Sequence, residues 1–118
     1  VRSINEYEIG HPSGAYNIPI MHRQGGAMIH NTDFVSVVEK NFSHETKLLL
    51  GCQIGARSMK AAEALAAAGF TNLCNVEGGF GGVRDTSGKL IQAGWAESGL
   101  PTEKGTINGT DYISLSEK

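Results

Sequence analysis

Short apolar runs alternate with an amphipathic segment in the middle of this chain. Residues 47–51 and residues 71–76 are each rich in apolar or β-branched side chains over the length of one strand. Between them, residues 58–68 repeat apolar side chains at helical spacing, and Gly69 follows as a left-handed helix end. A strand, a helix and a second strand in this order predict an α/β fold with a mostly parallel sheet and helices on both faces.

Weaker patterns precede this central unit. Residues 15–20 are predicted as a short strand, and residues 21–31 as a polar loop that contains glycine. A second helix is expected to begin at Thr32 or Asp33, since both are suitable N-cap residues. The apolar positions of this helix fall on one face: Phe34, Val37, Val38 and Phe42.

Length and charge narrow the classes of protein that fit. A chain of 118 residues is expected to form one domain with one apolar core. The formal net charge of -2 provides no positive surface for nucleic acid or for an anionic membrane. No apolar run is long enough to span a bilayer. We therefore expect neither a nucleic acid nor a membrane as a partner.

The two cysteines, Cys52 and Cys74, lie in different contexts. Two cysteines do not make the disulfide framework of small secreted proteins. Cys74 falls inside the predicted strand 71–76, where we expect a small buried side chain rather than a second reactive thiol. No metal site is predicted, because the histidines follow no metal-ligand spacing: His11, His22, His30 and His44.

Cys52 opens the loop between the central strand and the helix. Backbone N–H groups in such a loop and at a helix start have no partner within the helix, so they converge on whatever the loop holds. The helix dipole adds positive potential there, which favours a thiolate over a thiol. Arg57 contributes a permanent positive charge and a planar fork of donors that suits oxyanions. The arrangement predicts a sulfur nucleophile that attacks a small anionic substrate.

The loop motif resembles that of a known family. Cys52-x-x-Gly55-x-Arg57-Ser58 after an apolar strand is similar to the active-site loop of rhodanese-type sulfurtransferases, especially the small single-domain ones. The similarity covers residues 1–101, which we take as the domain, and residues 102–118 are treated as a tail. Further stretches resemble the family's first signature and its closing pattern, in the same order: Val1-Arg2-Ser3, Glu6-Tyr7-Glu8-x-Gly10-His11-x-x-Gly14-Ala15-x-Asn17-Ile18-Pro19, Gly69-Phe70, Val76-Glu77-Gly78-Gly79-Phe80 and Gly99-Leu100-Pro101.

This resemblance implies a three-layer α/β fold, in which a central, mostly parallel sheet carries helices on both faces. It implies transfer of sulfur from thiosulfate or a related small anionic donor to a thiophilic acceptor, cyanide or a thiol, through a persulfide on Cys52. It implies no cofactor, and we expect a cytoplasmic protein, with the periplasm as the alternative. The substrate-binding loop would consist of the residues that follow the catalytic cysteine: Gln53, Ile54, Gly55, Ala56, Arg57 and Ser58.

Four loop residues are assigned individual roles. Arg57 either binds the sulfonate of the donor or braces the loop by hydrogen bonds, and the two roles are weighed equally. Gly55 is expected to supply a backbone conformation that a side chain would block. Ser58 suits the helix start, where its hydroxyl bonds free amides. Gln53 stands where many thiosulfate-using relatives carry a basic residue, which departs from the family's pattern.

Two regions differ from the family's usual length. Val1 and Arg2 occupy the place where the first core strand of the family ends, so either that strand lies outside this sequence or another segment takes its place. Residues 111–115 alternate like a short strand and are the candidate for that place, with a frayed tail as the alternative. An insertion around residues 84–94 either makes tight glycine turns or forms a flap over the Cys52 loop, using Arg84 or Trp95.

Two other functions are consistent with a reactive cysteine. A sulfur-carrier or protein-interaction module would keep the reactive thiol but would not catalyse sulfur transfer. A cysteine-dependent phosphatase or arsenate reductase would also place a thiolate and an arginine around an anion. Those enzymes need one residue more between the cysteine and the arginine, because a tetrahedral oxyanion requires a wider cradle than a single sulfur atom. Only Gln53, Ile54, Gly55 and Ala56 intervene here, which favours sulfur chemistry.

Overall fold

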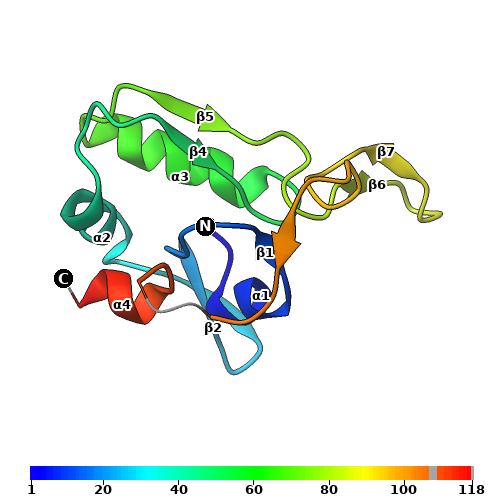
Figure 1. The fold of residues 1–118 in the computed structure, drawn as a ribbon, viewed down its shortest axis with the longest axis horizontal. Helices are drawn as coiled ribbons and strands as arrows, with labels where there is room; N and C mark the ends of the chain where they lie inside the picture. Colours follow the sequence, from blue (N-terminus) through cyan, green and yellow to red (C-terminus); the bar gives the residue numbers. More distant parts are fainter. Residues whose placement is uncertain (107–108, 118) are drawn as a thin grey trace.

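The predicted strand–helix–strand unit forms the centre of the computed structural model (Figure 1). β4 (Leu48–Leu50) pairs in parallel with β5 (Leu73–Asn75). α3 (Ala56–Ala67) connects the two strands and packs against both of them. Gly69 has a φ of 107°, which confirms the predicted left-handed turn after the helix.

α2 (Phe34–Asn41) confirms the second predicted helix and packs against α4 (Tyr112–Ser116). Its N-cap residue is Asp33, one of the two that were expected, but the Asp33 side chain makes no capping hydrogen bond. The side-chain oxygen of Asn31 instead accepts a hydrogen bond from the Asp33 N–H. The apolar core lies between these helices and α3, and its fully or almost fully buried side chains include Phe34, Val37, Val38, Ala61, Leu65 and Leu115.

α4 corrects the prediction of a strand over residues 111–115. Leu115 is fully buried in the core and Tyr112 is partly buried against it. Residues three apart share one face of a helix, so a helix buries both side chains at once. The Asn41 side-chain amide also donates to the carbonyl oxygen of Leu115, which fixes α4 beside α2. The expected replacement of a core strand by this segment is therefore wrong.

The amino-terminal part contains a helix that the sequence pattern did not predict, α1 (Ile4–Ile9). Its first turn is closed by a capping box, in which Ser3 and Glu6 exchange side-chain and backbone hydrogen bonds. β1 (His11–Pro12) follows and pairs with β8 (Thr102–Glu103), so the tail folds back on the start of the domain.

Two hairpins replace segments that were expected to be irregular. β2 (Met21–Gln24) and β3 (Ala27–His30) pair in antiparallel fashion where a polar loop was predicted. The turn is made by two glycines with positive φ, which the primed hairpin turns require. β6 (Val83–Arg84) and β7 (Leu90–Gln92) form a second hairpin within the expected insertion. Figure 1 shows this hairpin projecting from one end of the molecule.

The structure describes residues 1–106 and 109–117. The strands in these ranges form four two-stranded sheets, of which only β4–β5 is parallel. The α/β class is thus confirmed, whereas the described strands do not form one central sheet. Residues 15–20 belong to no strand in the described ranges, so the prediction of a strand there is wrong. The Ile20 N–H donates to the Val1 carbonyl over 3.1 Å.

Cys74 is exposed, and the prediction that it is buried is wrong. It lies opposite Leu49 in the β4–β5 register, and Leu49 is also exposed. Successive side chains of a strand point to opposite faces of a sheet. α3 packs on this two-stranded sheet, whereas the side of Cys74 and Leu49 remains open to solvent.

Candidate active site

Cys52 lies two residues after the end of β4, and it is only 1% exposed. The Gly55 N–H donates to the Cys52 Sγ over 3.0 Å, and the Ser58 hydroxyl oxygen lies 3.4 Å from the same sulfur. Gly55 has a φ of 111°, in the region that favours glycine, and this conformation folds its N–H back onto the sulfur. The loop therefore surrounds the thiol with hydrogen-bond donors, as its place before a helix predicts.

The surroundings of Cys52 lower the pKa of its thiol. Burial by itself raises the pKa of the Cys52 thiol. Hydrogen bonds from the Ser58 side chain and from the backbone N–H groups of Ser58, Gly55 and Ile54 outweigh burial and hold the pKa below its ordinary value. A thiol that ionises more readily is a better nucleophile at neutral pH.

Ser58 is buried beneath the thiol and does not cap the helix. The N-cap of α3 is Gly55, and the Ser58 hydroxyl donates to the Gly55 carbonyl over 3.0 Å rather than accepting from a free amide. The same hydroxyl donates to Oδ1 of Asn75, on β5. The expected capping role is therefore wrong. Ser58 instead links Cys52 to the neighbouring strand, and Asn75 is a loop-supporting residue that the sequence analysis did not identify.

Arg57 forms an ion pair with Glu6 of α1. Its Nη1 lies 2.7 Å from Oε1 of Glu6, and its Nη2 lies 2.9 Å from Oε2. The hydrogen bonds from Arg57 lower the pKa of the Glu6 carboxyl to about 2, with burial acting in the opposite direction. Both terminal nitrogens of the guanidinium thus bind one carboxylate. Of the two roles expected for Arg57, this contact corresponds to supporting the loop.

Arg2 brings a second positive charge to the loop. Its Nη1 donates to Oε1 of Gln53 over 3.1 Å, and its Nη2 donates to the Gly10 carbonyl. Its guanidinium carbon lies 4.4 Å from the centre of the Phe80 ring, within cation–π distance. The sequence analysis gave Arg2 no role, and its place in the motif Val1-Arg2-Ser3 was the only signal for one.

The glycine-rich segment after β5 closes the loop from the other side. The Phe80 N–H donates to the Cys52 carbonyl over 2.7 Å, and the Gly81 N–H donates to the Gln53 carbonyl over 3.0 Å. Gly79 has a φ of 58°, and a Cβ there would lie 2.4 Å from the Cys52 carbonyl oxygen. Only glycine fits so close to the Cys52 carbonyl oxygen. The glycine-rich segment therefore binds the carbonyl groups of the Cys52 loop, and the N–H groups of the loop can point towards the Cys52 sulfur.

The side chains of the predicted substrate-binding loop do not all point towards the Cys52 sulfur. Gln53 is partly buried under Arg2, whereas Ile54 and Ala56 are exposed on the outer side of the loop. Arg84 is exposed on the hairpin, where it donates to the Gly88 carbonyl, and it does not line the pocket at Cys52. Trp95 does line that pocket.

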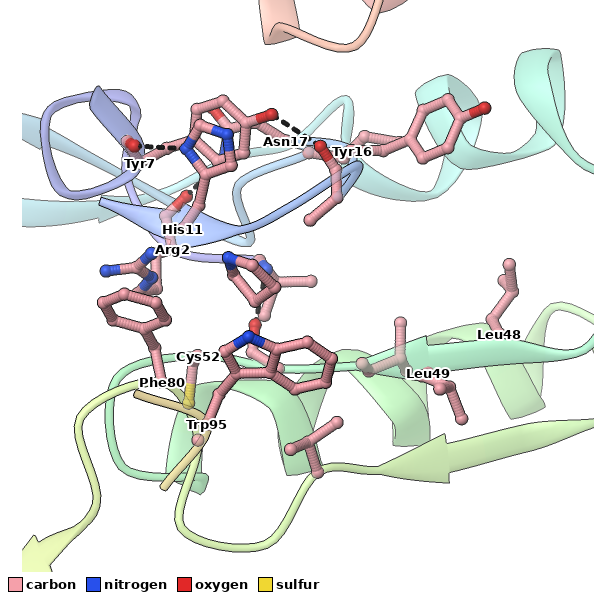
Figure 2. A pocket seen from close by; sticks show the side chains of 18 of the residues that line it. Arg2, Tyr7, His11, Tyr16, Asn17, Leu48, Leu49, Cys52, Phe80 and Trp95 are labelled. Carbon is pink, nitrogen blue, oxygen red and sulfur yellow. Dashed lines mark hydrogen bonds between the residues drawn. The ribbon is translucent and has the colours of Figure 1, made fainter. Parts of the chain in front are cut away.

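A cavity of about 400 Å³ reaches Cys52 from the side of the amino-terminal segment. In Figure 2, Phe80 and Trp95 lie beside Cys52 at one end of the cavity, and Leu48 and Leu49 lie farther along β4. Most of the lining side chains are apolar, so the cavity supplies an apolar approach to the thiol.

Residues 1–106 and 109–117 contain neither a cluster of metal-ligating side chains nor a membrane-spanning helix. The histidine, cysteine and acidic side chains there form no group that could hold a metal ion. No helix in those ranges has the length and apolar character needed to cross a membrane.

Comparison with known proteins identifies similar sequences. The family model described as "Rhodanese-like domain" matches residues 1–86. "Thiosulfate sulfurtransferase 16, chloroplastic" of Arabidopsis thaliana is 37% identical over 103 residues, which cover 87% of this chain and 76% of the relative. "Senescence-associated protein DIN1" of Raphanus sativus is 36% identical over 104 residues, which cover 88% of this chain and 50% of the relative.

A more distant relative has a name that refers to arsenic. "Protein HIGH ARSENIC CONTENT 1, mitochondrial" of Arabidopsis thaliana is 26% identical over 104 residues, which cover 88% of this chain and 54% of the relative. The chain thus spans about half the length of two of these three relatives.

Proposed function

This chain belongs to the rhodanese-like domain family, and from that premise we propose that it is a sulfurtransferase that works through a persulfide on Cys52. Its donor is thiosulfate or a related small anion, and its acceptor is cyanide or a thiol. Similarity to a relative named thiosulfate sulfurtransferase supports the reaction class. The hydrogen-bonded, readily ionised thiol in a loop of backbone donors is the observation that carries the proposal.

The reaction proceeds in two displacements. The Cys52 thiolate attacks the outer sulfur of thiosulfate, a new sulfur–sulfur bond forms, and the donor's own sulfur–sulfur bond breaks. Sulfite leaves with the electron pair of the broken bond, and Cys52 carries the transferred sulfur as a persulfide. Cyanide or an acceptor thiolate then attacks the outer sulfur of the persulfide and releases the Cys52 thiolate.

The residues of the loop stabilise anionic sulfur without a general base. Cys52 is the catalytic residue, and the N–H groups of Ile54, Gly55 and Ser58 are placed to donate to negative charge on its sulfur. The carboxylate of Glu6 holds Arg57, so Arg57 supports the loop, and its remaining positive potential attracts an anionic donor.

Arg2 compensates for the absence of a basic side chain at position 53. Gln53 accepts a hydrogen bond from Arg2, so a guanidinium lies next to the loop position where many relatives carry their basic residue. This charge supports an anionic donor as the substrate, because opposite charges attract a small anion towards the loop before the displacement.

Intact mass spectrometry tests the proposal. After incubation with thiosulfate, the wild-type protein should gain the mass of one sulfur atom, cyanide should remove it as thiocyanate, and Cys52→Ser should gain none. Cys74→Ser is the matched control, because Cys74 is the other cysteine and is exposed. Sulfur uptake on Cys74 alone, or no uptake from any donor, would contradict the proposal. Uptake without turnover would favour the sulfur-carrier module.

Arsenate reduction is a second candidate, which the name of one relative brings forward. The spacing of Cys52 and Arg57 argues against it, because four residues intervene and the ring is tighter than an arsenate cradle. Release of arsenite from arsenate, in the presence of a thiol reductant and at a rate above that of sulfur transfer, would overturn our choice.

A further inference from the structure

The Ser58 hydroxyl lies beside three hydrogen-bond acceptors but carries one proton. Its oxygen is 3.4 Å from the Cys52 Sγ, and it also lies within donating distance of the Gly55 carbonyl and of Oδ1 of Asn75. A serine hydroxyl can therefore donate to only one of these groups at a time. Ser58 is fully buried, so bulk water does not compete for its proton.

The Gly55 carbonyl is the acceptor that needs this proton least. It already accepts from the Met59 N–H over 3.2 Å, which is a hydrogen bond of the first turn of α3. Nδ2 of Asn75 donates to the same oxygen over 3.4 Å. Two donors occupy the two lone pairs of a carbonyl oxygen. The Ser58 proton therefore has two main acceptors, the Cys52 sulfur and the Asn75 amide oxygen.

The neighbours of the Asn75 amide fix its orientation. Asn75 is the last residue of β5 and is partly buried. Turning the amide around would place its oxygen beside the Gly55 carbonyl oxygen, and two acceptors repel each other. The amide nitrogen of Asn75 therefore faces Gly55, and its oxygen faces the Ser58 hydroxyl.

The charge on the Cys52 sulfur decides between the two acceptors. A thiolate binds a hydroxyl proton more strongly than a neutral amide oxygen does. A protonated thiol is only a weak acceptor. The persulfide of the proposed sulfur transfer behaves like the thiol in this respect, because its negative charge lies on the outer sulfur and the inner sulfur is neutral.

We propose that Asn75 is a positioning residue, whose amide oxygen competes with the Cys52 sulfur for the single proton of the Ser58 hydroxyl. The proton points to Cys52 while this sulfur is charged, and it points to Asn75 when the sulfur is neutral. Asn75 thus stabilises the thiol and the persulfide relative to the free thiolate. Its effect on the persulfide rests on the proposed function, whereas its effect on the ionisation of Cys52 does not.

The pKa of Cys52 in Asn75→Ala tests the proposal. A thiolate absorbs in the ultraviolet, so a pH titration in a Cys74→Ser background reports Cys52 without a reagent that must reach the buried sulfur. The same protein with Cys52→Ser supplies the baseline. The midpoint should fall by about 0.5–1 pH unit, because the Ser58 proton loses its competing acceptor and stabilises the thiolate. A merely structural role would move the midpoint upwards, since a disturbed loop loses donors to the sulfur.

A double-mutant cycle shows whether Asn75 acts through Ser58. In a Ser58→Ala background, Asn75→Ala should move the midpoint by less than about 0.3 pH unit, because the shared proton is gone. Asn72→Ala is the matched control and should leave the midpoint unchanged, because Asn72 is exposed just before β5. Asn75→Val removes the same acceptor but suits a strand, so it serves as a second variant.

Discharge of the persulfide tests the second part of the proposal. Cyanide should remove the transferred sulfur from Asn75→Ala roughly two- to threefold faster than from wild type, because a thiolate of lower pKa leaves more readily. Wild type that takes up no sulfur would contradict the proposed function, and the titrations would still decide the role of Asn75, because they use no sulfur donor.

Four results would overturn the proposal. They are an unchanged or raised midpoint in the Asn75 variants, an equal shift in the Ser58→Ala background, equal or slower discharge by cyanide, and failure of both Asn75 variants to fold. None of them bears on sulfur uptake by the wild-type protein, so the proposed function would stand.

Discussion

Arg57 and Glu6 form a two-point ion pair that ties the loop after Cys52 to α1. Their atoms lie 2.7 Å and 2.9 Å apart, across 51 positions of sequence. Glu6 is itself held by Ser3 through the capping box of α1. The amino-terminal helix thus fixes the orientation of the arginine that follows Cys52.

Replacing Arg57 tests this bracing role. Arg57→Lys should lower the melting temperature and cost about 1–2 kcal/mol of stability, because an ammonium cannot make two parallel bonds to one carboxylate. Transfer from thiosulfate and from an uncharged persulfide donor should fall by the same factor. Arg84→Lys is the control, because Arg84 also pairs with a glutamate but is exposed on the hairpin. A loss confined to thiosulfate, at an unchanged melting temperature, would assign Arg57 to donor binding.

Stability should depend on pH through Glu6. The folded-state pKa of Glu6, about 2, lies below its ordinary value of 4.5, so the folded protein favours the charged carboxylate. The stabilisation is therefore present above pH 4.5 and is lost as the pH falls towards 2, amounting to about 1–2 kcal/mol after solvent screening. Chemical denaturation at several pH values should show this loss in wild type, and Glu6→Gln should remove that part of the pH dependence.

The Cys52 thiol should ionise at a lower pH than an unstructured model thiol. Alkylation rates measured against pH in a Cys74→Ser background report the Cys52 pKa alone. Ser58→Ala should raise the midpoint, because the Ser58 side chain is a main cause that lowers this pKa. An unchanged midpoint in Ser58→Ala would show that the backbone donors alone set the ionisation.

Loop length should determine which anion the site accepts. Inserting one glycine between Ala56 and Arg57 should sharply slow sulfur transfer, because it moves Arg57 relative to Glu6 and widens the ring around Cys52. Hydrolysis of an aryl phosphate, measured in parallel, should stay below sulfur transfer in the native loop. A native loop that cleaves the phosphate faster would refute the size argument.

The tail should contribute to stability through α4. Leu115→Ala should destabilise the domain by about 2–5 kcal/mol, because it empties a fully buried site in the core. Ile113→Ala, on the exposed side of the same helix, should cost little. Urea denaturation of both variants measures the difference, and equal losses would mean that α4 does not pack as described.

Sequence reasoning succeeded where a structure depends on neighbouring residues. Periodicity located β4, α3, α2 and β5 to within a few residues, because apolar spacing and end signals act within one element. The same local logic predicted the glycine conformation at Gly55 and the ring of donors around Cys52. The family signatures added the hypothesis that this loop transfers sulfur.

Contacts between distant segments were decided only by the tertiary structure. The sequence left two roles open for Arg57, because its partner Glu6 lies on a helix that apolar periodicity did not reveal. The sequence pattern predicted Cys74 to be a buried strand residue. It is exposed, because no described element covers its face of β5. Residues 111–115 alternate like a strand, but packing of Leu115 against α2 makes them helical.

One physical reason separates the features that the sequence predicted from those that only the tertiary structure decided. Cys52, its backbone donors and the start of α3 are joined by a few peptide bonds, so sequence alone was enough to predict a thiol within a small loop of backbone donors. The burial of Cys52 and the ion pair that orients Arg57 depend on which distant surfaces meet. Which surfaces come into contact depends on the free energy of the whole folded chain. A short stretch of sequence does not determine that free energy.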